Sequence, residues 1–224
     1  EYLKSYVDTY LKEEILQEQL VRSVVPFRKF LPIAAQMNGN IINYNKIAKD
    51  LGVDWTTVKT YFEILEDTLL GLLLPSFDRS LRKQQLKGSK FYLFDTGVKR
   101  ALDRSLSLHL STSQQIGPIF EHFIILEINR LNHYLRKDFR LSFVATKAGL
   151  EIDLIVERPG LKDLLIEIKS TDNIREDHLK HLVKIKSEYP DFDAICICQE
   201  KTAREVLGVK ILPWEIALKN LELG

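Results

Sequence analysis

The sequence has few cysteines, almost no net charge and no long apolar run, and each shortage narrows the classes of protein it can encode. Cys196 and Cys198 are its only cysteines. They alternate with isoleucine in an apolar segment, where we expect small buried residues in a reducing compartment rather than a disulfide or a metal site. The formal net charge is +1 over 224 residues, so a basic surface for nucleic acid would have to be local.

Signals for membrane insertion and secretion are missing as well. No apolar run approaches the roughly 20 residues that span a bilayer, and no signal peptide opens the chain. These absences predict a cytoplasmic protein without a membrane partner. The chain begins at Glu1 with no initiator methionine, and we therefore expect a further segment to precede it.

Periodicity and composition divide the chain into three parts. Residues 1–104 combine predicted helices with a hairpin, residues 105–116 form a linker rich in serine and threonine, and residues 117–224 alternate strands with helices. A chain of this length suits two small domains. We therefore predict an α/β protein in which an N-terminal helical domain precedes a mixed sheet flanked by helices.

The first part has the order of elements found in a winged helix-turn-helix. Apolar residues recur at helical spacing in four segments, at residues 1–22, 26–36, 44–51 and 55–66. Gly52 and a capping Asp54 separate the last two helices, an arrangement typical of a helix-turn-helix. Two strand-like runs at 72–77 and 90–94 then enclose a basic loop, which we interpret as the wing.

This order predicts contact with DNA through two groups of side chains. The second helix of the pair would enter a groove with Trp55, Thr56, Thr57, Lys59 and Thr60. The wing would contact phosphates with Arg79, Arg82, Lys83, Lys87 and Lys90. The alternative is a module that docks another protein and whose charged hairpin tip is merely solvated.

The last part, residues 117–224, begins with a predicted helix. The helix opens at Gly117-Pro118, and its broad apolar face suits packing on a sheet. Glu121 falls in the expected first turn, where a carboxylate interacts favourably with the helix dipole. The patterns that follow predict strands at 140–146, 151–157, 164–170, 193–198 and 209–213, and helices at 176–188, 202–207 and 214–218.

One pair of neighbouring strands concentrates charge. A turn-rich connector joins residues 151–157 to residues 164–170, so we expect the two strands to be antiparallel. Glu167 and Lys169 share one face of their strand, and Asp153 would join them from the other strand. Two carboxylates can hold a hard divalent cation, and an adjacent ammonium can orient or activate a water. The alternative is a surface ion pair between Glu167 and Lys169, worth less than ~1 kcal/mol.

These residues resemble the PD-(D/E)XK nuclease superfamily. The segments 149–156 and 166–169 follow a helix that carries Glu121, in the superfamily's core order of helix, three strands, helix and strand. The sequence departs from the superfamily pattern at Ile152, where the pattern has proline. The resemblance implies a restriction-endonuclease-like fold for this part of the chain.

More specifically, the chain resembles the C-terminal region, called DUF4143, of a prokaryotic P-loop ATPase family. The winged-helix segment 47–61 carries this resemblance, together with Phe94-Asp95-Thr96-Gly97 and Gly117-Pro118-Ile119-Phe120-Glu121. In that family a P-loop ATPase domain precedes this region, but the sequence contains no Gly-x-x-x-x-Gly-Lys-Ser/Thr. ATP would therefore act only through an upstream domain absent from this chain. A homo-oligomer is compatible with the sequence.

The superfamily resemblance also implies roles for individual residues. Asp153 and Glu167 match the metal carboxylates, and the backbone carbonyl of Ile168 would be a further ligand for Mg²⁺ or Mn²⁺. Lys169 matches the catalytic lysine, and Glu121 matches the helix acid that some members add. The implied function is DNA binding with metal-dependent hydrolysis of phosphodiester bonds. The alternative is a catalytically inactive nuclease fold that serves as a scaffold for docking nucleic acid or protein.

Overall fold

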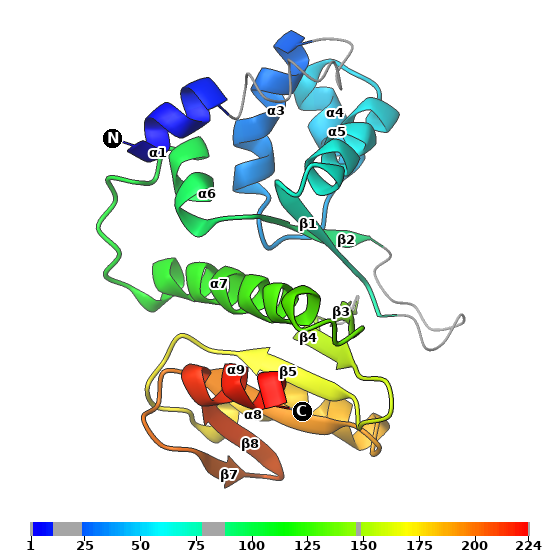
Figure 1. Cartoon of the computed structure of the whole chain (residues 1–224), viewed down its shortest axis with the longest axis vertical. Helices are drawn as coiled ribbons and strands as arrows, with labels where there is room; N and C mark the ends of the chain where they lie inside the picture. Colours follow the sequence, from blue (N-terminus) through cyan, green and yellow to red (C-terminus); the bar gives the residue numbers. More distant parts are fainter. Residues whose placement is uncertain (1, 11–23, 78–87, 147–148, 224) are drawn as a thin grey trace. The chain divides into compact units, whose positions relative to one another are not determined.

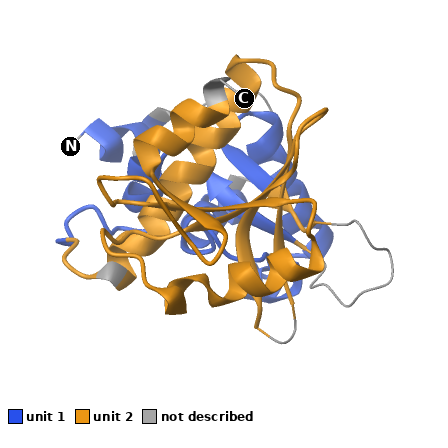
Figure 2. Ribbon diagram, turned by 90° about the horizontal axis from the view of Figure 1, so that it is seen from below, with its two compact units in different colours: residues 1–73, 89–109 blue, residues 74–88, 110–224 orange. Residues whose placement is uncertain are grey.

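The computed structural model describes residues 2–10, 24–77, 88–146 and 149–223 (Figure 1). The chain divides into two compact units (Figure 2). Unit 1 comprises residues 1–73 and 89–109, and unit 2 comprises residues 74–88 and 110–224. The division at residues 109 and 110 falls within the predicted linker, whereas the loop that we interpret as a wing is grouped with unit 2.

Unit 1 is helical apart from one hairpin. Its elements are α1 (Tyr2–Ser5), the π-helix η1 (Tyr6–Tyr10), α3 (Val24–Gln36), α4 (Tyr44–Leu51), α5 (Trp55–Asp67), β1 (Gly71–Pro75), β2 (Ser89–Leu93) and α6 (Thr96–Leu102). The last two residues of β1 are grouped with unit 2. The two helices of the predicted helix-turn-helix are confirmed as α4 and α5. Of the predicted helix 1–22, residues 2–10 are described, and there α1 runs into η1 instead of continuing as an α-helix. β1 and β2 form a two-stranded sheet.

Local chemistry fixes the ends of α4, and an aromatic cluster fixes how the helices pack. The side chain of Asn43 caps α4 by accepting a hydrogen bond from the backbone N–H of Lys46 at 3.0 Å. Gly52 ends the helix with a φ of 67°, a left-handed conformation that glycine adopts readily. The ring of Phe62 on α5 then contacts the rings of Phe30 and Phe91, with centroids 4.8 and 4.9 Å apart. All three aromatic side chains are fully buried and form the centre of this unit's core.

Unit 2 is a mixed α/β layer built on six strands. Its elements are α7 (Ser113–Tyr134), β3 (Arg140–Ala145), β4 (Glu151–Glu157), β5 (Leu164–Ile168), α8 (Glu176–Glu188), β6 (Asp193–Cys198), β7 (Arg204–Val206), β8 (Val209–Pro213) and α9 (Trp214–Leu223). The strand order is β3-β4-β5-β6-β8-β7. The pairs β3–β4, β4–β5 and β7–β8 are antiparallel, and β5–β6 and β6–β8 are parallel. The predicted α/β class and the mixed sheet are confirmed.

Helices bury the middle of this sheet. α8 packs on β4, β5 and β6, α7 contacts β5, and α9 contacts β6 and β8. α7 and α9 also pack on each other, with the rings of Phe123 and Trp214 in edge contact at 5.4 Å. Because β5 is covered by both α7 and α8, all five of its residues are buried. Cys196 and Cys198 of β6 are buried free thiols, as expected for core residues.

Two predicted elements of unit 2 are wrong in detail. The predicted helix 202–207 is instead the strand β7, which pairs with β8. Leu207 and Gly208 connect the two strands with φ values of 53° and 71°, and two positive φ values in a row are the geometry of a tight hairpin turn. The helix predicted to open at Gly117-Pro118 begins earlier, at Ser113, so Pro118 lies inside α7.

Candidate functional site

The two charged strands are neighbours in the sheet, in the predicted antiparallel orientation. Leu154 of β4 lies opposite Ile166 of β5. This register places Asp153 opposite Glu167, since antiparallel partners advance in opposite directions. Lys169 follows β5 directly, on the same side as Glu167. The structure therefore brings together the three residues that sequence periodicity placed on one face.

A β-bulge falls at Asp153. In the β3–β4 pair, Ser142 lies opposite Ile155 and Val144 lies opposite Ile152. Two residues of β4, Asp153 and the next one, therefore face a single residue of β3. Bulges bend a strand and re-aim its side chains, and they are common beside active sites. This irregularity explains how a carboxylate in the middle of a buried strand turns toward a neighbouring cavity.

Hydrogen bonding holds both carboxylates in place. The backbone N–H of Ile168 donates to Asp153 Oδ2 at 2.7 Å. Lys169 Nζ lies 2.5 Å from Glu167 Oε1. Glu167 is only 6% exposed, so the alternative of a solvated surface pair is wrong. Within the part of the chain that the structure describes, the buried Oε2 atom of Glu167 has no hydrogen-bond partner.

Burial and charge make Glu167 an unusual carboxyl group. Desolvation, reinforced by the charge of Asp153, raises the pKa of Glu167 to about 8, although Lys169 acts in the opposite direction. Desolvation alone would lower the pKa of Lys169, but the charges of Glu167 and Asp153 outweigh it and raise that pKa. The ammonium is therefore retained beside a carboxyl group that prefers its neutral form. Such opposed environments are typical of functional sites, although structural ion pairs also produce them.

Asp153 and Lys169 border a cavity of about 530 Å³, whereas Glu167 is not among the described residues that line it. Asp153 and Ile168 contribute from the strands, and Glu121 contributes from α7. The rest of the lining consists of Gly117, Pro118, Lys169, Ser170, Thr171, Asn173, Arg175 and His178. The cavity lining thus combines the carboxylates of Asp153 and Glu121 with basic and hydrogen-bonding side chains.

Glu121 reaches this cavity from a position that differs from the predicted one. Because α7 begins at Ser113, Glu121 lies beyond its first turn, and no acidic residue occupies that turn. The predicted interaction with the helix dipole is therefore wrong. Glu121 nevertheless lines the same cavity as Asp153 and Lys169, as the superfamily resemblance implies for a helix acid.

Sequence reasoning missed the segment that follows β5. Ser170, Thr171, Asn173 and Arg175 carry no recognisable motif, and only the fold brings them to the cavity. Two residues that follow β6 in the chain, Glu200 and Arg204, hold this segment through hydrogen bonds. Ile174 donates its backbone N–H to Glu200 Oε1 at 2.7 Å, and its carbonyl accepts a hydrogen bond from Arg204 at 2.6 Å. Arg204 and Glu200 are themselves joined at 2.7 Å.

The donor set fits a magnesium ion. Mg²⁺ usually keeps several waters and binds a protein through one or two carboxylates. Asp153 and Glu167 are two such carboxylates, and the unpartnered Glu167 Oε2 is an oxygen for which a cation would compensate. Among the described residues, no group of three or more His, Cys, Asp or Glu side chains could hold a metal ion. The candidate ligands are thus the two strand carboxylates and the Ile168 carbonyl, without Glu121.

The predicted nucleic-acid residues of the second helix lie at the beginning of α5. Trp55 is 51% exposed, and Thr56, Lys59 and Thr60 are also exposed. Thr57 is half-buried. An exposed tryptophan on a short polar helix face is uncommon, because most large aromatic side chains are highly buried. Lys59 pairs with Glu63 at 3.2 Å, one turn along the helix.

Of the predicted wing residues, the structure describes Lys90. Lys90 lies in β2 and is 3% exposed, so its side chain is not at the surface. Arg79, Arg82, Lys83 and Lys87 lie outside the described residues.

The fold and site define a two-unit α/β protein with a buried pair of carboxylates beside a lysine. Residues 1–113 match a domain of unknown function, DUF8612, and residues 116–217 match a second one, DUF4143. Because the first match spans half of the chain, the chain belongs to the DUF8612 family. The second match confirms the resemblance to DUF4143 for residues 116–217, whereas the segments 47–61 and 94–97, which also carried that resemblance, lie within the DUF8612 match.

Two curated relatives are uncharacterised mycobacterial proteins. The chain is 26% identical over 167 residues to Rv2008c of Mycobacterium tuberculosis and to Mb2031c of Mycobacterium bovis. Each alignment covers 74% of this chain but only 37% of the relative. No solved structure matches the chain. None of the helices in the described ranges is long and apolar enough to cross a membrane.

Proposed function

We propose that unit 2 is a metal-dependent nuclease that hydrolyses phosphodiester bonds in DNA. The observation that carries this proposal is the buried Glu167, which lies between Asp153 and Lys169 and has one oxygen without a partner. Burying two carboxylates together is unfavourable unless a positive charge compensates for them. Lys169 supplies one such charge, and a divalent cation would supply the rest.

Asp153, Glu167 and the Ile168 carbonyl would hold Mg²⁺ or Mn²⁺, which when bound polarises a phosphate and lowers the pKa of a water. The protein's own groups have distinct tasks. The Ile168 N–H orients Asp153. Lys169 keeps its proton and places a positive charge where a phosphoryl oxygen becomes more negative. Arg175, Asn173 and Thr171 line the cavity and would position the phosphodiester backbone.

Unit 1 would direct the nuclease unit to DNA. α3, α4 and α5 followed by the β1–β2 hairpin have the element order of a winged helix. In this proposal the exposed Trp55, Thr56, Lys59 and Thr60 enter a groove, with the half-buried Thr57 behind them. Arg79, Arg82, Lys83 and Lys87 would contact phosphates. An upstream ATPase domain would couple ATP to this module. The curated relatives have room for such a domain, since the alignment covers only 37% of their length.

One observation favours a second candidate, an inactive scaffold that docks nucleic acid or protein. In the described ranges, the site has two carboxylates but no cluster of three potential metal-ligating side chains. A site that has lost a ligand could keep its fold and its affinity for nucleic acid without cleaving it.

A cleavage assay distinguishes the two candidates. The purified chain is incubated with single- and double-stranded DNA and with RNA, in Mg²⁺, Mn²⁺ or chelator. We expect metal-dependent cleavage that falls at least about 100-fold in Asp153→Asn and Lys169→Ala. The matched controls Asp172→Asn and Lys180→Ala change exposed residues outside the cavity lining and should cleave normally. If no substrate is cut with either metal, or if all four variants behave alike, the nuclease proposal fails.

A further inference from the structure

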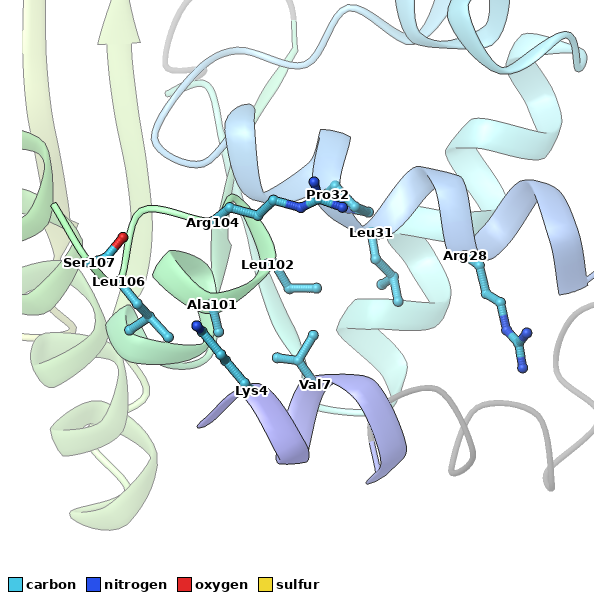
Figure 3. Close-up of a pocket in the computed structure, with 10 residues that line it drawn as sticks. All are labelled: Lys4, Val7, Arg28, Leu31, Pro32, Ala101, Leu102, Arg104, Leu106 and Ser107. Atoms are coloured by element: carbon cyan, nitrogen blue, oxygen red, sulfur yellow. The ribbon is translucent and has the colours of Figure 1, made fainter. Parts of the chain in front are cut away.

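Unit 1 contains a cavity of its own, with a volume of about 500 Å³ (Figure 3). This volume lies within the range of roughly 300–1,000 Å³ that is common for small-molecule sites. Val7 of η1, Leu31 of α3 and Leu102 of α6 turn toward one another and form its buried floor (Figure 3). Pro32, Ala101 and Leu106 extend the apolar wall. Three helical elements distant in sequence thus build one apolar hollow.

Three positive charges border this hollow. Lys4, Arg28 and Arg104 line it, and none of the described residues in the lining is an aspartate or glutamate. Arg28 lies at the end of the cavity away from Lys4 (Figure 3). Across residues 2–10, 24–77, 88–146 and 149–223, the structure records no ion pair for any of the three. By contrast, Lys99 in the same unit pairs with a carboxylate at 2.6 Å. Uncompensated cations around an apolar floor favour an anionic ligand.

The lining also indicates which kind of anion fits. None of its described residues is aromatic, so among them there is no ring on which a nucleobase could stack. Aliphatic side chains suit an alkyl chain, which gains free energy from leaving water without any directional contact. A carboxylate or phosphate group at the end of such a chain would then meet the basic side chains at the rim.

From this combination we infer that unit 1 binds a small anionic amphiphile, an alkyl chain of medium length that ends in a carboxylate or a phosphate. The alkyl chain rests on Val7, Leu31 and Leu102, and the head group is held by Lys4 and Arg104 or by Arg28. This site is independent of the proposed nuclease activity, since every lining residue belongs to unit 1.

Calorimetric titration of the full 224-residue chain tests this inference. Octanoate and octyl phosphate are the probes, 1-octanol is the neutral probe of equal chain length, and acetate and inorganic phosphate represent the head groups alone. We expect saturable binding of the two octyl anions about fivefold tighter than that of octanol, because one or two exposed ion pairs amount to about that change in affinity. Acetate and inorganic phosphate should bind far more weakly, since they lack the apolar contact.

Variants locate the binding. The triple variant Lys4→Gln, Arg28→Gln, Arg104→Gln should reduce octanoate affinity to that of octanol, and Ala101→Phe should weaken both by filling the hollow. A matched control removes three exposed lysines of unit 1 outside the lining, with Lys29→Gln, Lys46→Gln and Lys49→Gln, and should bind octanoate normally. Circular dichroism verifies that each variant is folded.

Several results would overturn the inference. The inference is wrong if octanol binds as tightly as octanoate, if the control triple loses as much affinity as the rim triple, or if Ala101→Phe leaves binding unchanged. Vesicles separate a soluble ligand from a bilayer lipid. If phosphatidylglycerol vesicles retain the chain while octanoate gives no heat, the basic rim binds a membrane surface and the proposed ligand class is wrong.

Discussion

Glu167→Gln is the most direct test of the candidate site, because it removes a charge while keeping the shape of the side chain. Desolvation raises the pKa of Glu167 from an ordinary 4.5 to about 8, a difference equivalent to an upper limit of roughly 5 kcal/mol. The folded-state pKa is the higher one, so the folded protein holds the proton more tightly than the unfolded chain does. Stability linked to this group is therefore complete below pH 4.5 and is lost as the pH rises toward 8.

The variant should lack this decline. Between pH 4.5 and pH 8, the free energy of unfolding of the wild type should fall relative to that of Glu167→Gln by on the order of 2–5 kcal/mol. The new amide also buries an N–H where Oε2 has no partner, which costs about 1–3 kcal/mol at every pH. The difference in pH dependence is consequently the informative quantity, and the absolute difference at one pH is not.

Urea denaturation at a series of pH values measures this difference in pH dependence between the wild type and Glu167→Gln. Glu176→Gln, an exposed substitution on α8, serves as the control. Saturating Mg²⁺ should stabilise the wild type at pH 8 more than it stabilises Glu167→Gln, because ligand binding to the folded state adds to its stability. Parallel pH profiles for wild type and Glu167→Gln would refute the reasoning, since Glu167 would then titrate as an ordinary carboxyl group.

Three further predictions concern metal binding at Glu167, the packing of unit 1 and the segment that follows β5. Binding of Mn²⁺ at pH 7 should release about 0.9 proton, because Glu167 must ionise to bind the metal; titrations in buffers of different ionisation enthalpy measure the release, and none is expected if the metal binds elsewhere. Gly71→Ala should destabilise unit 1 by about 1–3 kcal/mol in thermal unfolding, because its Cβ would overlap the ring of Phe91. Arg204→Ala should speed amide hydrogen exchange at Ile174 by about tenfold while leaving exchange in the core strands unchanged, because it removes the hydrogen bond to that carbonyl; unaltered exchange would show that Arg204 does not hold the segment.

Much of the fold follows from local signals in the sequence. Gly52 acts on its own neighbours, so the end of α4 could be predicted from that residue, whereas the capping role of Asn43 was not predicted. The alternation of charge and apolar residues likewise predicted β4 and β5, and the turn-rich connector between them predicted their antiparallel pairing. Local signals failed where the backbone adopts an uncommon conformation. Leu207 has a positive φ, which leucine rarely adopts, and the hairpin at β7 was therefore predicted as a helix.

The start of α7 shows how a strong local signal can mislead. Proline is common in the first turn of a helix, which favoured a start at Gly117-Pro118. The actual first turn is at Ser113, after Thr112, and Gln115 accepts hydrogen bonds from backbone N–H groups there. A serine- and threonine-rich stretch reads equally well as a linker or as a helix cap. The consequence reaches the site, since Glu121 lies further along the helix than predicted.

The burial of the site is the property least visible in the sequence, and the functional proposal depends on it. On an exposed strand, Glu167 and Lys169 would be an ordinary ion pair worth less than ~1 kcal/mol. Their strand is instead covered by α7 and α8, which come from segments before and after the sheet meander. Periodicity reports which residues share a face, but not whether a distant helix covers that face. The same Glu-x-Lys spacing is therefore trivial in one fold and chemically significant in another, and the pKa of Glu167 is the measurable quantity that separates the two.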